Sequence, residues 1–162
     1  MKLSIKMYLG FAIPAFVLIG VGTYALYSFR IMNQQLGTIY DDRVVPLTQL
    51  KVISDQYAVN IIDAVNKTDA GLISMTQTLQ MIEAAEQATQ ENWQAYLKTE
   101  LTIEEKKLVD EVQALFTPVN REIASLKRAL QSQDLVRVKA FNGPLYQVID
   151  PLTIKVQELT NL

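Results

Sequence analysis

The sequence predicts an all-α protein, with one transmembrane helix followed by an antiparallel four-helix bundle of up-down-up-down topology. Three observations lead to this prediction. An uninterrupted stretch of 22 residues near the N-terminus carries no charge. Beyond it, apolar residues recur three and four positions apart, as on one face of a helix. No sustained apolar–polar alternation, which would mark a strand, is present.

The uncharged stretch, residues 8–29, is expected to cross the membrane. As a helix it spans roughly 30 Å, the thickness of a bilayer's hydrocarbon core. A secretory signal peptide is the alternative, but its apolar core has about 7–15 residues and ends in small residues. This stretch is longer and ends in aromatic Tyr24, Tyr27 and Phe29, with Tyr8 at its other end. Aromatic residues at both ends are typical of the two membrane interfaces.

Basic residues predict the orientation. Lys2, Lys6 and the amino terminus outweigh Arg30, so the N-terminus is expected in the cytoplasm and the rest of the chain outside it. Residues 1–29 would form a short cytoplasmic N-terminus and the membrane helix. Residues 30–162 would form one folded domain, because no Pro-, Gly- or Ser-rich linker divides them.

Composition narrows the chemistry of this domain. It holds 13 basic and 17 acidic residues and no basic stripe, which argues against nucleic acid binding. The chain has no Cys and no His, so disulfides and thiolate zinc sites are excluded, and the commonest general base and metal ligand are missing. We therefore expect no enzyme activity, no cofactor and no metal site.

The first helix of the domain is expected from about residue 30 to 67. Pro46 predicts a kink or a short non-helical step near Val45, because proline lacks a backbone N–H. Residues 68–71 (TDAG) end the helix in a turn. The residues expected on its apolar face are Leu36, Ile39, Val44, Leu47, Leu50, Ile53, Tyr57, Asn60, Ile61, Ala64 and Val65.

Two capping boxes open the next helices. Ser74 with Gln77, and Thr102 with Glu105, have the spacing at which side chains satisfy each other's free backbone N–H groups. These helices should extend to about residues 99 and 130, with Pro118 a point of bending in the third. Their expected buried residues are Leu79, Ile82, Ala85, Trp93, Tyr96 and Leu97, then Leu108, Val112, Leu115, Phe116, Val119, Ile123, Leu126 and Leu130.

Asp134 is the expected N-cap of the fourth helix, which residues 142–144 (NGP) and Pro151 should break or kink. Four helices with short connections pack most simply in an up-down-up-down bundle. The fourth then returns towards the membrane, and a chain that stops at Leu162 is expected to be a fragment. The expected buried residues of this helix are Leu135, Val138, Phe141, Leu145, Ile149, Leu152, Val156 and Leu159.

Several segments have a familiar pattern. Residues 40–47 (YDDRVVPL) and 55–63 (DQYAVNIID) resemble the first helix, and residues 141–146 (FNGPLY) and 149–152 (IDPL) the last helix, of the four-helix-bundle sensor domains of bacterial methyl-accepting chemotaxis proteins. The resemblance covers essentially the whole chain, anchor included. Similar bundles also occur on sensor kinases and cyclases.

The resemblance implies a periplasmic ligand sensor that is anchored in the inner membrane and acts as a homodimer. It also implies a second transmembrane helix, a HAMP linker and a methylatable cytoplasmic coiled coil, none of which this sequence contains. In the aspartate-sensing members, arginines on the first helix of both subunits hold the ligand's carboxylates. Residues 51–67 contain no Arg, so that specificity is not implied here.

Helix positions suggest another ligand site at the far end of the bundle. Arg128 and Arg137 each lie about one turn from the last helix connection, and Asn60, Asp63 and Lys67 reach the same end. A planar guanidinium can bind a carboxylate bidentately, so we expect a small anionic ligand such as an organic acid or an amino acid. The alternative is that these residues are solvated and that Arg128 complements a helix dipole.

The sequence therefore favours the extracytoplasmic sensing region of a chemotaxis transducer. It would bind a small molecule, directly or through a periplasmic binding protein, and pass a helix displacement across the membrane. Two alternatives stay open: the same module on a histidine kinase or diguanylate cyclase, and a membrane-tethered bundle that binds only a protein partner.

Overall fold

A computed structural model describes residues 3–39 and 43–162, with side chains from Gly10 to Asn33 and from Arg43 onward. The predicted positions Tyr8, Leu36 and Ile39 and the motif residues 40–42 therefore lie outside the described side chains. The described residues contain helices and no strand, which confirms the all-α class. The chain forms two compact units, Met1–Arg43 and Val44–Leu162. The elements are α1 (Leu3–Ile39), α2 (Val45–Asp55), the π-helix η2 (Gln56–Ile61), α3 (Ile62–Asp69), α4 (Met75–Tyr96), α5 (Ile103–Gln131), α6 (Leu135–Ala140) and α7 (Asn142–Thr160).

The first unit consists of α1. Its stretch Gly10–Asn33, 24 residues long, is long and apolar enough to cross a membrane, and none of it is buried against other parts of the protein. Large apolar side chains such as Phe16 and Leu18 are exposed along it. Exposed apolar side chains all around a helix are what a lipid environment accommodates. The stretch overlaps most of the predicted membrane segment, residues 8–29.

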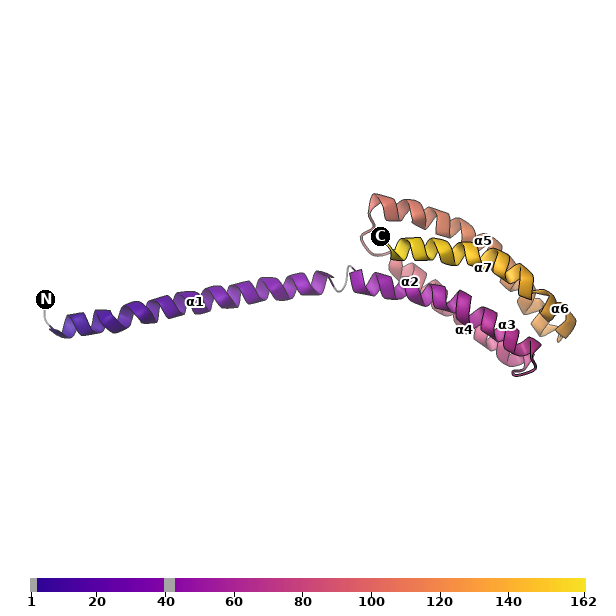
Figure 1. Ribbon diagram of the computed structural model, residues 1–162, viewed down its shortest axis with the longest axis horizontal. Helices are drawn as coiled ribbons and strands as arrows, with labels where there is room; N and C mark the ends of the chain where they lie inside the picture. The colour runs from indigo at the N-terminus through magenta and orange to yellow at the C-terminus, as the bar shows by residue number, and fades with distance from the viewer. Residues whose placement is uncertain (1–2, 40–42) are drawn as a thin grey trace. The chain divides into compact units, whose positions relative to one another are not determined.

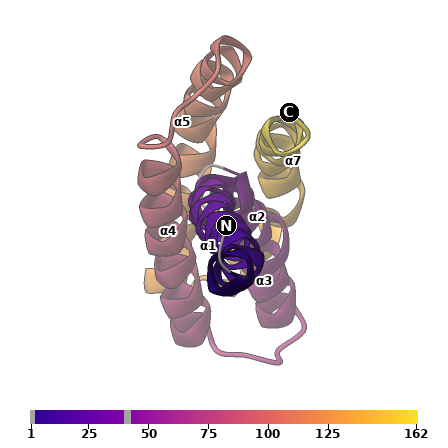
Figure 2. The ribbon, with the colours of Figure 1, turned by 90° about the vertical axis from the view of Figure 1, so that its left-hand side faces the viewer.

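The second unit is a bundle of four rods. Rod one is α2, η2 and α3, rod two is α4, rod three is α5, and rod four is α6 with α7. Successive rods run in opposite directions (Figure 1), and α2 and α5 each pack against both α4 and α7. Seen roughly along the rods, the four occupy the corners of the bundle (Figure 2). This arrangement confirms the predicted up-down-up-down topology.

The predicted helix starts are present. The Ser74 hydroxyl accepts a hydrogen bond from the Gln77 N–H at 3.2 Å, and the Ser74 N–H donates to Gln77 Oε1 at 2.9 Å. Thr102 and Glu105 make the equivalent pair at 3.1 and 2.7 Å. Asp134 Oδ1 accepts from the Arg137 N–H at 3.0 Å. Each pair satisfies donors that a helix start leaves free, which is why these boundaries could be predicted.

Prolines set the other boundaries. Helix α2 begins at Val45 with Pro46 in its first turn, where the missing N–H costs no hydrogen bond. Arg43 and Val44 before it are in π-helical conformation, so the described residues show a departure from regular α-helix near Val45 and no non-helical step. Rod four is interrupted at Phe141, between α6 and α7, which confirms the predicted break near Pro144. Pro118 and Pro151 lie inside α5 and α7.

The predicted core is buried in most positions. Leu50, Ile53, Ile82, Ile123 and Ile149 have almost no exposed surface, and the hydroxyls of Thr68 and Thr78 are hydrogen-bonded to each other between α3 and α4.

Three core predictions are wrong: Val44, Leu47 and Leu135 are 44%, 42% and 38% exposed. All three lie at the start of a rod, where the neighbouring rods end, so the apolar pattern continues past the packing that would cover it.

Candidate ligand-binding site

The residues predicted to bind a ligand lie in three rods. Asp63 and Lys67 belong to α3 and form an ion pair at 2.6 Å across one helical turn. Asn60 lies in η2 and donates to Gln56 Oε1 at 2.8 Å. Arg128 is in the last turn of α5, and Arg137 is in α6; both are exposed.

Of these five residues, the structure pairs only Asp63 with Lys67. The Arg128 guanidinium donates to Ser125 Oγ at 2.9 Å, within its own helix. Rods one and four are joined at this end by a different pair, Lys139 and Asp69, at 2.7 Å. Among the described residues, no hydrogen bond or ion pair links either arginine to rod one. The five predicted residues share one half of the bundle, but they do not form a closed site.

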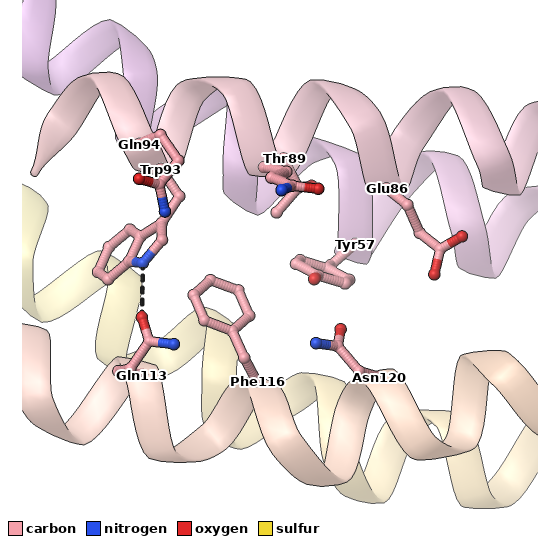
Figure 3. A pocket seen from close by; sticks show the side chains of 9 residues that line it. Tyr57, Glu86, Thr89, Trp93, Gln94, Gln113, Phe116 and Asn120 are labelled. Carbon is pink, nitrogen blue, oxygen red and sulfur yellow. Dashed lines mark hydrogen bonds between the residues drawn. The ribbon is translucent and has the colours of Figure 1, made fainter.

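A cavity of about 450 Å³ lies elsewhere, between α4 and α5, with Tyr57 of η2 reaching into it (Figure 3). This volume is in the range of small-ligand sites. Its walls contain three aromatic rings, four side-chain amides, the hydroxyls of Tyr57 and Thr89, and one carboxylate, Glu86. Carbonyl oxygens and N–H groups of amides can bind a polar ligand group, and aromatic rings offer apolar faces.

The ring of Phe116 contacts the other two aromatic rings of the wall. Trp93 and Phe116 meet edge to face with ring centroids 5.3 Å apart, and Tyr57 lies 6.2 Å from Phe116. Such arrangements are favoured by the quadrupoles of aromatic rings. Tyr57 and Trp93 are only 2% and 4% exposed, so each ring is nearly buried in the core.

Several polar side chains on the cavity wall lie close enough to a neighbour to form a hydrogen bond. The Trp93 indole N–H donates to Gln113 Oε1 at 2.8 Å, which joins α4 to α5 (Figure 3). The hydroxyl of Thr89 is buried beside Tyr57 and can form a hydrogen bond with its phenol. Burial, and then the nearby charge of Glu86, raises the pKa of Tyr57. Its phenol therefore stays neutral at physiological pH and keeps its proton as a hydrogen-bond donor.

The carboxylate on the wall is part of a small charge network. Lys127 Nζ lies 2.7 Å from Glu86 Oε2 and 3.7 Å from Glu83 Oε1. The hydrogen bond to Glu86 is the main cause that raises the pKa of Lys127. Two carboxylates and one ammonium give this network a net charge of −1. Only Glu86 of the three lines the cavity.

Sequence reasoning missed this cavity. Tyr57, Trp93 and Phe116 were assigned to the core because they fall on apolar stripes, and they are buried as expected. Nothing in the spacing indicates that three core aromatics border a space. The π-helix that carries Tyr57 leaves no distinct sequence pattern either. Among the described residues there is no group of His, Cys, Asp and Glu that could hold a metal ion.

Known proteins resemble the chain closely. Residues 1–133 match a family described as the four helix bundle sensory module for signal transduction. Over 148 residues the chain is 34% identical to the methyl-accepting chemotaxis protein NahY of Pseudomonas putida; the match covers 89% of this chain and 28% of the relative, so the chain spans little more than a quarter of that protein. No solved structure matches it. With the predicted bundle confirmed, this chain belongs to the family of four-helix-bundle sensory modules for signal transduction, in the form that methyl-accepting chemotaxis proteins carry.

Proposed function

We propose that this chain is the periplasmic ligand-sensing region of a chemotaxis transducer, and that ligand binding displaces rod four against rod one. One observation carries the mechanism: α7 packs along α2 and ends, at Thr160, at the end of the bundle where α2 begins (Figure 1). A shift of ~1–2 Å between packed helices is an established switching motion. The ligand must bind one arrangement more tightly than the other, because equal affinity shifts nothing.

The output is part of the proposal. The relative is a methyl-accepting chemotaxis protein, of which this chain spans 28%. A chemoreceptor output therefore fits the comparison better than the histidine kinase or diguanylate cyclase considered from the sequence. A sensory module of this family is a signalling domain without catalysis. Ligand would reach it directly or through a periplasmic binding protein.

A homodimer is proposed as the signalling state. Rod one exposes the apolar side chains Val44, Leu47 and Val59, which are 44%, 42% and 54% exposed. Covering apolar surface in a second copy of the bundle would stabilise a pair of rods one by the hydrophobic effect. Ligand bound to either subunit would then act across the same interface.

The predicted anionic ligand is kept as a proposal for the end of the bundle that carries Arg128 and Arg137. It is supported by the exposure of both guanidiniums and by the lack of a carboxylate partner for either among the described residues. Free guanidiniums at one end of a bundle can each donate paired hydrogen bonds to an organic acid or amino acid. Lys67 is less available because Asp63 pairs with it.

A binding screen on the whole chain in lipid nanodiscs tests whether the bundle binds a small molecule and whether Arg128 and Arg137 hold an anionic one. Amino acids, organic acids and small amines are screened for thermal stabilisation, and hits are titrated by calorimetry. For a carboxylate bound at the arginines, Arg128→Ala or Arg137→Ala should weaken binding ~10- to 150-fold, the equivalent of one charge-assisted hydrogen bond. Arg121→Ala, also exposed on α5 but two turns away, is the matched control. Equal binding by all four proteins would place the site elsewhere.

Displacement is measured with spin labels. The chain has no native Cys, so Thr48→Cys on α2 and Thr160→Cys on α7 give one labelled pair without background. Both positions border the groove between these helices. A bound hit should shift their separation by ~1–2 Å. A pair within α5, Ala114→Cys with Ala124→Cys, should not move. An unchanged α2–α7 separation with saturating ligand contradicts the sensing mechanism.

A further inference from the structure

We infer that the cavity between α4 and α5 binds a small organic cation, with its ammonium group at Glu86 and against the aromatic rings of Tyr57 and Phe116. The inference rests on the proposed function, since it names the ligand class for a bundle that senses small molecules. It differs from the anionic ligand expected near Arg128 and Arg137 in charge, in location and in the residues involved.

The charge of the wall selects a cation. Glu86 is the only charged residue on the cavity wall. Its hydrogen bond from Lys127 goes to Oε2, and Oε1 receives none from the described residues. Lys127 is itself shared with Glu83, so a net negative charge remains next to the cavity. An anion would meet this charge with no basic residue on the wall to offset it.

The rings supply the second attraction. A cation within about 6 Å of the face of an aromatic ring is attracted by the ring's quadrupole. Tyr57, Phe116 and Trp93 form one contacting group on the wall, and Tyr57 lies between Phe116 and Glu86 in Figure 3. Glu86 and the three aromatic residues therefore line the same space. An alkylated ammonium group can interact with the carboxylate through its charge and with the aromatic rings through its apolar surface.

Polar groups on the wall fit the remainder of such a ligand. The amide of Asn120, on α5, lies across from Glu86 of α4 (Figure 3). Gln90 and Gln94 of α4 also line the cavity. The volume of about 450 Å³ suits one small molecule.

The chain contains a built-in reporter for this cavity. Trp93 is the single tryptophan of the protein and lines the cavity wall. Excitation of tryptophan in the whole chain in detergent micelles, which contain no other protein, therefore reports on this site alone. The probe is choline, titrated at constant ionic strength. Two matched compounds accompany it: 3,3-dimethylbutan-1-ol, which has the same shape without the charge, and benzoate, which has the opposite charge.

Choline should change the Trp93 emission saturably, and the neutral analogue should bind about 10-fold more weakly or worse, a difference of ~1.4 kcal/mol. Glu86→Gln keeps the side-chain shape and should weaken choline binding by a similar factor. Glu91→Gln is the matched control: it removes an exposed carboxylate of α4 that hydrogen-bonds to Gln87, does not line the cavity and does not contact Lys127. Its effect should stay below about 3-fold. Phe116→Leu should cost about 5-fold through the lost ring face.

The inference is overturned if choline gives no saturable change, if the neutral analogue or benzoate binds as well as choline, or if Glu91→Gln weakens binding as much as Glu86→Gln. The comparison of choline with its analogue on the unmodified protein keeps the test decisive even if a variant fails to fold. The spin-label experiment distinguishes a failure of this inference from a failure of the proposed sensing function. Another compound that moves α7 while choline does not bind leaves the proposed function standing. Choline that binds without moving α7 establishes the site and contradicts its sensing role.

Discussion

At the scale of single residues, Tyr96, near the connection between α4 and α5, has both a buried ring and a buried hydroxyl group. Tyr96 is 1% exposed and stacks on Trp93 with ring centroids 5.7 Å apart. Its hydroxyl has no hydrogen-bond partner among the described residues. Burial, followed by the charge of Glu105, raises the pKa of Tyr96 to about 12. The ring of Tyr96 therefore stabilises the fold through packing, whereas its unpaired hydroxyl lowers the free energy of unfolding.

Tyr96→Phe should leave the protein as stable or stabilise it by up to ~1–3 kcal/mol, because it removes an unpaired buried hydroxyl and keeps the ring. The pH dependence should change too. An unfolded tyrosine loses its proton near pH 10, and folded Tyr96 near 12, so stability falls as pH rises between those values. The variant should lose less stability over this window, although Tyr57 and Lys127, whose pKa values are also raised, keep part of the slope.

Urea unfolding of the whole chain from pH 8 to 11, followed by circular dichroism, measures both effects. Tyr146→Phe, at an exposed position on α7, is the control and should match the unmodified protein. A Tyr96→Phe variant that is destabilised and has the same slope at high pH would show that the hydroxyl is paired.

At the scale of elements, the helices begin where side chains satisfy backbone groups and change course where the backbone departs from regular α-helix. Rod one contains the π-helix η2, over Gln56–Ile61, directly where Tyr57 meets the cavity. Single turns of π-helix are rare and often occur at functional sites. Gly71, with φ of 71°, closes the turn after α3 in a conformation that glycine adopts without steric cost. The part of rod one that carries Tyr57 into the cavity is thus also the part that departs from regular α-helix.

Removing a helix cap should have a measurable effect. Thr102→Ala deletes the hydroxyl that accepts from the Glu105 N–H and should cost ~1 kcal/mol, or about 3–5 °C in Tm for a unit of this size. Thr117→Ala, exposed inside the same helix, should be neutral or slightly stabilising because alanine favours helix. Thermal unfolding followed at 222 nm gives both values. Equal melting temperatures for Thr102→Ala and the unmodified chain would show that this cap contributes nothing.

At the scale of the whole molecule, the chain joins a membrane-anchoring helix to a sensory bundle. The candidate span Gly10–Asn33 carries one charge, Arg30, close to its end. The bundle has its own core, which includes residues from all four rods. Which side of the membrane the bundle occupies depends on the basic residues near the anchor, because loops rich in Lys and Arg stay in the cytoplasm.

We predict that the bundle lies in the periplasm. Alkaline phosphatase, which is active only outside the cytoplasm, should be active when fused after Leu162, and a fluorescent protein that folds only in the cytoplasm should be dark there. Replacing Lys2 and Lys6 by Glu should reduce phosphatase activity, because Arg30 then dominates the charge balance. Replacing Lys106 and Lys107, which lie far from the anchor, is the control. A bright cytoplasmic reporter after Leu162 in the unmodified chain would reverse the proposed orientation.

The sequence by itself determined the helical class, the rod boundaries and the long apolar segment. These features depend on neighbouring residues: Ser74 with Gln77, Thr102 with Glu105, Asp134 with the following turn, and prolines 46 and 144 at helix starts. Apolar residues at helical spacing predicted nearly all of the core, because a bundle buries one stripe of each rod. The family could also be inferred from the sequence, because the resemblance lies in short continuous segments such as residues 40–47 and 141–146.

Only the tertiary structure decided what the buried residues border. Val44, Leu47 and Leu135 continue the apolar stripes yet are exposed: Val44 and Leu47 line an open groove beside α7, and Leu135 is the first residue of α6. Tyr57, Trp93 and Phe116 come from three different rods, and their spacing along the chain carries no information about the space between them. The charge beside that space likewise depends on Lys127 of α5 meeting Glu83 and Glu86 of α4. Cavities and charge networks arise from distances between rods, and those distances are set by packing of the whole core.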